Sequence, residues 1–197
     1  NRVFVDDLLA SGETGQDILD LGTGTAQIPV VLCQRLENCR VMAVDLAVQM
    51  LDLAVYNVEA AGLINQIQLA HVDAKQMPFE DNMFDAVMSN SIVHHIPDPY
   101  DVLKEAVRVL KPGGLAITML YHKGFKYYIR KLLLYGILKG EFFQYNAREI
   151  VSRHSEDFGN SPLTKVYSRN DAKHMFSMFD SLSISCHRID DYIPIGN

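Results

Sequence analysis

The chain has 197 residues, 48% of them hydrophobic and 21% charged, which is enough to bury a sizeable core and excludes wholesale disorder. Its net charge of −6 provides no overall basic face for duplex nucleic acid, so we expect no nucleic-acid partner. Three cysteines without a C-x-x-C spacing, and no apolar run of about 20 residues, argue against a disulfide framework, a structural zinc site and a membrane span, so we expect a cytoplasmic protein.

Short apolar runs alternate with helical patterns along the first 120 residues. The expected helices carry apolar stripes from Ile28 to Leu36, across 48–61, and after Asp98, which can cap the third one. This alternation predicts an α/β fold: a doubly wound, mostly parallel sheet with helices on both faces, in three layers. Ligands bind such sheets beyond the carboxyl ends of the strands, so we expect the chemistry after the first four. The strands are expected at 17–21, 40–44, 67–72, 84–89 and 115–120.

The composition changes after residue 120. Residues 121–145 are rich in aromatic and basic side chains, and we interpret 121–165 as a lid-like insertion within a single domain that spans residues 1–197. The lid would line an apolar substrate pocket. Two other interpretations stay open: an ordinary solvated amphipathic helix, and contact with a membrane surface through 121–140.

The last part of the chain has two helix starts and one strand signal. Asn146 with Glu149, and Ser168 with Asp171, have capping-box spacing. Residues 182–186 are expected to form a returning strand. Because the chain starts with Asn-Arg and stops soon after that strand, we expect its ends to be truncated. An incomplete sheet edge would pair with a second chain, so a homodimer is a further expectation.

The main chemical signal is the run Asp20-Leu21-Gly22-Thr23-Gly24-Thr25-Ala26. Glycines at a strand-to-helix turn let the backbone bend sharply and approach a ligand closely. A dinucleotide fingerprint would need a third glycine where this chain has Gln27. A Gly-x-Gly turn alone is weak evidence and leaves an NAD site open.

The run from Ile18 to Thr25 resembles motif I of class I S-adenosylmethionine-dependent methyltransferases. Further matches follow in the family's order: Val41 to Asp45, His71 to Ala74, Phe84 to Val87, and Leu110 to Gly114. Together they cover about residues 17–120. The resemblance implies a Rossmann-like fold and in-line transfer of a methyl group from S-adenosylmethionine, which leaves as S-adenosylhomocysteine. No metal is implied, and we find no convincing ligand cluster for one.

The resemblance also assigns cofactor contacts. It implies that Asp45 binds the ribose hydroxyls, that Asp73 reads the adenine amino group, and that Asp20 bonds the methionine amino group. The plain structural alternatives are a helix cap for Asp45, a loop turn for Asp73 and a brace for the glycine loop for Asp20. The full expected set is Asp20, Gly22, Thr23, Gly24, Asp45, Leu46, Met50, Asp73, Ala74, Asn90 and Ser91.

A catalytic base is less well defined by the sequence. His94 and His95 follow the fourth strand, and an imidazole titrates near neutral pH, so His95 is a candidate general base for a hydroxyl acceptor. The plain alternative is a loop that packs on the next helix. We therefore predict an enzyme that methylates a small molecule; an NAD-dependent oxidoreductase and a non-catalytic cofactor-binding module are the alternatives. The acceptor, the methylated atom and the oligomeric state stay open.

Overall fold

The computed structural model describes residues 5–6, 9, 17–36, 38–90, 92–122, 124–154 and 164–186. These residues divide into two compact units. The first contains residues 1–92, 100–119 and 185–197, and the second contains residues 93–99 and 120–184. The two units are described in turn.

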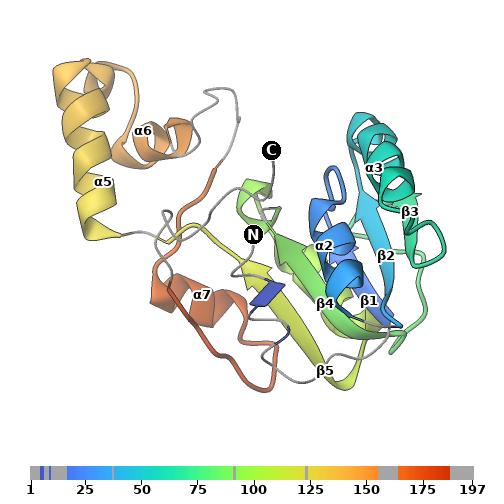
Figure 1. The fold of residues 1–197 in the computed structure, drawn as a ribbon. Helices are drawn as coiled ribbons and strands as arrows, with labels where there is room; N and C mark the ends of the chain where they lie inside the picture. Colours follow the sequence, from blue (N-terminus) through green and yellow to red (C-terminus); the bar gives the residue numbers. More distant parts are fainter. Residues whose placement is uncertain are drawn as a thin grey trace. The chain divides into compact units, whose positions relative to one another are not determined.

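The first unit contains a five-stranded parallel sheet in the order β3-β2-β1-β4-β5 (Figure 1). Its strands are β1 (Asp17–Leu21), β2 (Arg40–Asp45), β3 (Ile67–His71), β4 (Phe84–Asn90) and β5 (Leu110–Met119). The helices are α2 (Gln27–Arg35), α3 (Val48–Ala60) and α4 (Tyr100–Val109). The predicted strands and helices are thus confirmed, with ends that differ by a residue or two except for the start of β5.

The strand order reverses between β1 and β4. Because β-α-β crossovers are right-handed, α2 and α3, which lead outward from β1 to β3, cover one face of the sheet. The helix α4 runs from β4 to β5 in the opposite direction and covers the other face. Figure 1 shows α2 and α3 side by side. The predicted doubly wound, three-layer α/β fold is therefore present, and its switch point lies between β1 and β4.

The core lies where this sheet meets α2 and α3. The apolar side chains of β1, Ile18, Leu19 and Leu21, are buried on both faces of the sheet, as is typical of parallel strands. The helices contribute their inner stripes, which on α3 consist of Leu51, Ala54 and Val58, while Val55 is exposed. The central side chains of this core are Ile18, Leu32, Val41, Ala43, Ala54, Val58, Ile67, Ala86 and Met88.

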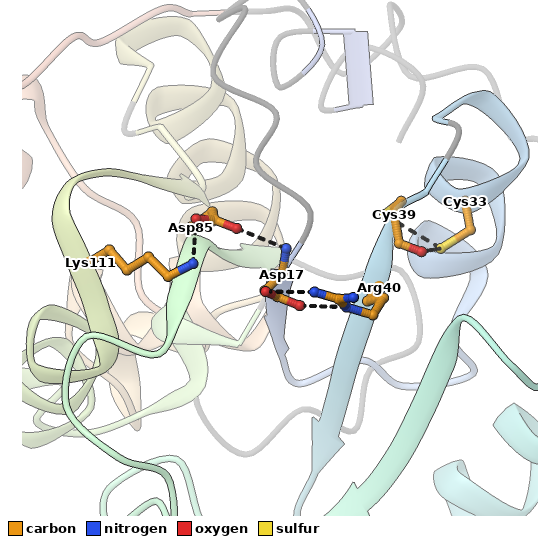
Figure 2. Close-up of polar contacts among 6 residues, drawn as sticks. All are labelled: Asp17, Cys33, Cys39, Arg40, Asp85 and Lys111. Carbon is orange, nitrogen blue, oxygen red and sulfur yellow. Dashed lines mark hydrogen bonds and ion pairs between the residues drawn. The ribbon is translucent and has the colours of Figure 1, made fainter.

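Charged side chains cross the amino-terminal edge of the sheet (Figure 2). Arg40 on β2 makes two hydrogen bonds to the carboxylate of Asp17 on β1, at 2.7 and 3.0 Å. The Asp17 backbone N–H donates to Asp85 on β4 at 3.0 Å, and Lys111 on β5 pairs with the same Asp85 at 2.6 Å. Four strands are therefore linked at the edge opposite the predicted site.

Strand β5 begins earlier than predicted. Leu110 already pairs with Phe84, and the next pair along the strands is Leu115 with Ala86. The intervening residues bulge out, with Gly113 at φ +77°, a conformation that glycine adopts without strain. Residues 111–114, which precede the strand expected at 115–120, therefore form a bulge inside β5 rather than a connection before it.

The second unit is mainly helical. Its helices are α5 (Phe125–Lys131), which continues into π-helical turns (Leu132–Leu138), then α6 (Ala147–Arg153) and α7 (Arg169–Met175), with short 3-10 turns at Val93–His95 and Glu141–Phe143. Both predicted capping boxes are confirmed, with Asn146 and Ser168 accepting backbone N–H groups at the starts of α6 and α7. His122 and Tyr167 form an isolated parallel bridge.

The returning strand predicted at 182–186 is wrong. Residues 181–186 have no regular secondary structure, and Leu182 is exposed. The alternation of Leu182, Ile184 and Cys186 suits a half-buried strand, but a strand needs a hydrogen-bonded neighbour. The sheet formed by the described residues stops at β5 on that side.

Candidate cofactor-binding site

The loop after β1 reverses the chain with three left-handed residues. Gly22, Gly24 and Ala26 have φ values of +70°, +56° and +58°. The backbone N–H groups of Gly22 and Thr23 both donate to the carbonyl of Val44 at the end of β2, at 2.9 Å. These bonds hold the predicted glycine loop at the carboxyl edge of the sheet, where α2 begins.

The two glycines of this loop have different surroundings. A Cβ atom on Gly22 would lie 1.8 Å from Cγ2 of Ile92, so only glycine fits against the segment that follows β4. A Cβ on Gly24 would meet no atom within 4 Å. The space beside Gly24 is open, and a ligand can approach the backbone there at van der Waals distance.

Asp45 joins the glycine loop to the start of α3. Its Oδ2 accepts the N–H of Gly24 at 2.8 Å, and its Oδ1 accepts the N–H of Ala47, the cap residue of α3, at 2.8 Å. The N-cap of α3 is Ala47 and has no side-chain cap, so the helix cap considered as the alternative for Asp45 is not formed. Each carboxylate oxygen has a second lone pair, so these bonds leave acceptor capacity for two hydroxyl groups.

Asp20 is the last but one residue of β1 and is buried. Burial raises the pKa of Asp20 to about 7, the nearby charge of Asp45 acts in the same direction, and the hydroxyl of Thr23 opposes them. A carboxyl group in this state gains its charge readily when a cation comes close. The site therefore contains one half-buried carboxylate, Asp45, and one buried carboxyl group that titrates near neutral pH.

Apolar side chains lie in the open beside these carboxyl groups. Leu46 directly follows β2 and is 64% exposed, and Met50 on the first turn of α3 is 44% exposed. The Nε2 atom of His71, at the end of β3, lies 3.0 Å from the carbonyl oxygen of Leu46 and fixes the backbone there. Exposed Leu and Met beside an open glycine loop form a surface on which a flat apolar group can pack.

Asp73 and Ala74 follow β3 at the same edge of the sheet. Asp73 is exposed, and its Oδ1 accepts the N–H of Lys75 at 2.9 Å, which is the predicted loop turn. The N–H of Val72 donates to the carbonyl of Asp45 at 3.2 Å. The loop that carries Asp73 and Ala74 is thus attached to the loop that carries Asp45.

The loop after Asp73 is fastened by a residue that the sequence did not suggest. Arg108 on α4 donates to the carbonyls of Met77 and Phe79, at 3.0 and 2.7 Å, and pairs with Asp81 and Glu105. Glu105 in turn accepts the N–H of Met77 at 2.8 Å. A planar guanidinium reaches several acceptors at once, and its role here depends on contacts distant in sequence.

The end of β4 completes this edge. Asn90 is the last residue of the strand and is half-buried, while Ser91 lies outside the described residues. Ser89 is buried, and its hydroxyl makes no hydrogen bond within the described part of the chain. A serine ending the apolar run Ala-Val-Met was the available sequence signal, although Ser89 was not among the predicted site residues.

The structure brings one predicted set together. The parallel register places Leu21 beside Val44, Asp45 beside His71, and Asp20 beside Met88, so the ends of β1 to β4 lie at one edge. All described cofactor contacts predicted from the sequence lie in the first unit.

No group of three or more His, Cys, Asp or Glu side chains suited to a metal ion occurs among the residues that the structure describes.

His95 belongs to the second unit. Its ring lies 4.3 Å, centroid to centroid, from that of buried His94, which also contacts the ring of Tyr121 at 4.5 Å. The carbonyl of His94 accepts the N–H of Lys165 at 2.9 Å. These contacts of the histidine loop are with residues of its own unit, and both its expected packing on the next helix and the catalytic role of His95 stay predictions.

Comparison with known proteins gives a family match and several relatives. A family described as a methyltransferase domain matches residues 19–118. A demethylmenaquinone methyltransferase of Bacillus cereus is 39% identical over 106 residues, which is 53% of this chain and 44% of that protein. A relative of the same name from Bacillus pumilus is 36% identical over 112 residues, 56% of this chain and 47% of that protein. The chain thus spans less than half the length of these relatives.

Solved structures share the fold. The YcgJ protein of Bacillus subtilis superposes with a TM-score of 0.65 over 90% of this chain and 68% of its own, at 17% identity. The cyclase SpnF superposes with a TM-score of 0.52 over 59% of this chain and 43% of its own, at 30% identity. Because one of these neighbours is a cyclase, the fold alone does not determine the reaction.

Proposed function

Because the chain belongs to the methyltransferase domain family, we propose that it transfers a methyl group from S-adenosylmethionine to a small-molecule acceptor. The observation that supports this most is the carboxylate of Asp45, which holds the open glycine loop and keeps acceptor capacity for ribose hydroxyls. The NAD-dependent alternative is not favoured, since the family match covers the whole of the expected cofactor region.

The residues present suit this cofactor. We assign the open space beside Gly24 to the bound cofactor. Leu46 and Met50 are assigned to the apolar faces of its ribose and adenine. Asp73 and Ala74 are assigned to the edge of the adenine. Asn90, at the end of the strand that pairs with β1, is assigned to the cofactor as well, and Ser91 stays a prediction from the sequence. The buried hydroxyl of Ser89 is an additional polar group at this position.

Asp20 is assigned to the cationic end of the cofactor. Burial holds the pKa of Asp20 at about 7 when no cation is bound. An ammonium group beside it would favour the ionised form, so binding below neutral pH would release a proton from Asp20. When bound, S-adenosylmethionine supplies a sulfonium-activated methyl group, and the chain's contribution is to position the acceptor in line with it and to exclude water.

The acceptor is assigned only by class. The Bacillus cereus and Bacillus pumilus relatives are named for demethylmenaquinone, and we propose a small molecule with an apolar ring as the acceptor of this chain. His95 is the candidate for accepting the acceptor's proton.

A cytoplasmic location and a homodimer stay predictions. Among the described helices, none has the length and apolar character of a membrane span.

Calorimetric titration with S-adenosylmethionine, S-adenosylhomocysteine and NAD tests the cofactor assignment. We expect both adenosyl compounds to bind and NAD not to bind, and we expect Asp45→Asn to weaken binding about tenfold or more through lost charge-assisted hydrogen bonds. Asp52→Asn is the matched control, because it removes an exposed carboxylate from α3 outside the site.

A second variant separates binding from folding. Leu46 is exposed, so Leu46→Ser should leave the melting curve unchanged. The same substitution should weaken the binding of both adenosyl compounds. Absence of adenosyl binding by the folded wild-type protein would overturn the proposal. NAD binding in its place would favour the oxidoreductase. A radiolabelled methyl-transfer assay with a demethylated naphthoquinol then tests the acceptor class, and lack of transfer to it would exclude this class only.

A further inference from the structure

Large apolar side chains are exposed along the helix from Phe125 to Leu138 and the turn after it. Leu138 is 77% exposed and Phe143 is 94% exposed. Soluble proteins seldom expose a contiguous group of this kind without a binding role. The members of this group, called the apolar patch below, are Ile129, Leu133, Leu134, Ile137, Leu138, Phe142 and Phe143.

The spacing of these residues places them on one side of the helix. Ile129, Leu133 and Ile137 follow each other at intervals of four, and Leu134 and Leu138 form a second row with the same interval. Residues four apart are neighbours on a helix surface, and in the π-helical turns residues four and five apart both come close. The two rows therefore lie side by side.

The turn after the helix is packed back onto it. Gly136 is buried, and a Cβ atom there would lie 2.3 Å from the ring of Phe142, so that ring covers the glycine directly. This contact fixes one face of Phe142 and leaves the ring 46% exposed. The neighbouring Phe143 projects from an ordered turn, which lowers the entropy lost when it enters an apolar phase.

A basic edge runs beside the apolar patch. Lys131 and Lys139 lie over the ring of Tyr135, with Nζ to ring-centroid distances of 5.3 and 4.7 Å. That ring stacks on His154 at 3.5 Å, and Nε2 of His154 lies 2.9 Å from the carboxylate of Glu141. The two cations thus flank one fixed aromatic ring, one helical turn on either side of it.

Charge is segregated between this segment and the rest of the chain. Residues 121–140 contain five of the chain's 18 basic residues and none of its 24 acidic ones, so the remainder carries thirteen basic residues against 24 acidic. A second copy of the chain would bring an equally basic segment against the same patch. An anionic surface complements it without such repulsion.

We propose that the apolar patch docks this unit on an anionic lipid bilayer. Its Leu, Ile and Phe side chains enter the boundary between headgroups and acyl chains, while Arg130, Lys131 and Lys139 bind lipid phosphates. Figure 1 shows α5 and the turns after it as one continuous helix beside α6. With seven residues in α5 and seven in the π-helical turns, this helix is shorter than the about 20 residues that a bilayer span needs, and we place it on the bilayer surface.

This proposal does not depend on the proposed methyl transfer, and its test measures no activity. Co-sedimentation of the whole chain with phosphatidylcholine vesicles that contain phosphatidylglycerol should show binding that falls with added salt, and vesicles of phosphatidylcholine alone should bind weakly. Leu138→Ser with Phe143→Ser should weaken binding about tenfold or more. Arg130→Glu should also weaken it. Tyr56→Ser, at a 71% exposed position on α3, should bind like the wild type.

A single-tryptophan reporter makes the test independent of these losses, because the chain contains no tryptophan. The emission of Phe143→Trp should shift to the blue and be quenched by brominated lipids when anionic vesicles are added. Tyr56→Trp should show neither change. Equal binding to neutral and anionic vesicles, no response from Phe143→Trp, or a patch that only joins two copies in solution would each overturn the proposal.

Discussion

The two glycines of the loop after β1 should respond differently to alanine. At Gly22 a methyl group meets Ile92 at 1.8 Å, and the residue also has φ +70°. The left-handed conformation costs alanine about 1–2 kcal/mol, and forced overpacking costs typically about 1–3 kcal/mol more. Gly22→Ala should therefore lower the free energy of unfolding by about 2–5 kcal/mol.

Gly24→Ala is the matched control for that change. It has a similar φ of +56° but an open surrounding, so only the conformational cost of about 1–2 kcal/mol applies. The loss of unfolded-chain entropy is the same for both substitutions and cancels in their difference. Gly24→Ala should instead weaken the binding of S-adenosylmethionine about tenfold or more, because the methyl group of the alanine fills the space assigned to the cofactor.

Urea unfolding followed by far-UV circular dichroism measures the two stabilities, and calorimetry on the folded variants measures the affinities. Equal destabilisation by both substitutions would show that Ile92 does not press on Gly22 as the structure indicates. A Gly24→Ala protein that binds the cofactor normally would refute the assignment of the open space, whatever its stability.

Two further predictions concern Asp20 and Arg108. Burial raises the pKa of Asp20 from 3.8 to about 7, so between these values the folded state binds more protons than the unfolded state and stability falls as pH rises. The contribution to the slope is at most about 1.4 kcal/mol per pH unit, and Asp20→Asn should flatten a urea-stability profile measured from pH 4 to pH 7; an unchanged slope would contradict the raised pKa. Arg108→Lys should lose about 2 kcal/mol of stability, because an ammonium group cannot reach the carbonyls of Met77 and Phe79 together, whereas Arg35→Lys at an exposed ion pair should change little. A melting temperature shared by the Arg108 and Arg35 variants would refute that account.

Local patterns predicted what local forces decide. The apolar runs of β1 to β4 and the side chains that cap α6 and α7 act within a few residues, and each was assigned correctly from the sequence. The parallel sheet followed from the alternation of elements, since handedness leaves few ways to connect them. The same alternation predicted that Asp20, Asp45 and Asp73 lie at one end of the strands.

Features that depend on distant contacts were not predicted. Arg108 bonds the loop after Asp73 only because segments distant in sequence meet in the fold. The close contact of Ile92 with Gly22 likewise depends on the three-dimensional structure. The segment 182–186 failed for a related reason, since an alternating pattern indicates a half-buried surface without supplying a neighbouring strand. The sequence alone likewise does not tell whether Leu138 and Phe143 belong to a core stripe or to a surface patch. Their exposure in the folded structure assigns them to the surface.

The charged contacts at the amino-terminal edge of the sheet have a consequence for the opposite edge. A parallel strand that slips by two residues keeps its inward and outward faces, so apolar burial alone penalises the slip weakly. It would, however, separate Arg40 from Asp17, or Lys111 from Asp85. Since β1 and β2 are nearly rigid over their five and six residues, an offset fixed at one end is carried to the other. The ion pair at the amino-terminal ends of β1 and β2 thus helps to set the register that aligns the glycine loop with Asp45 at their other ends.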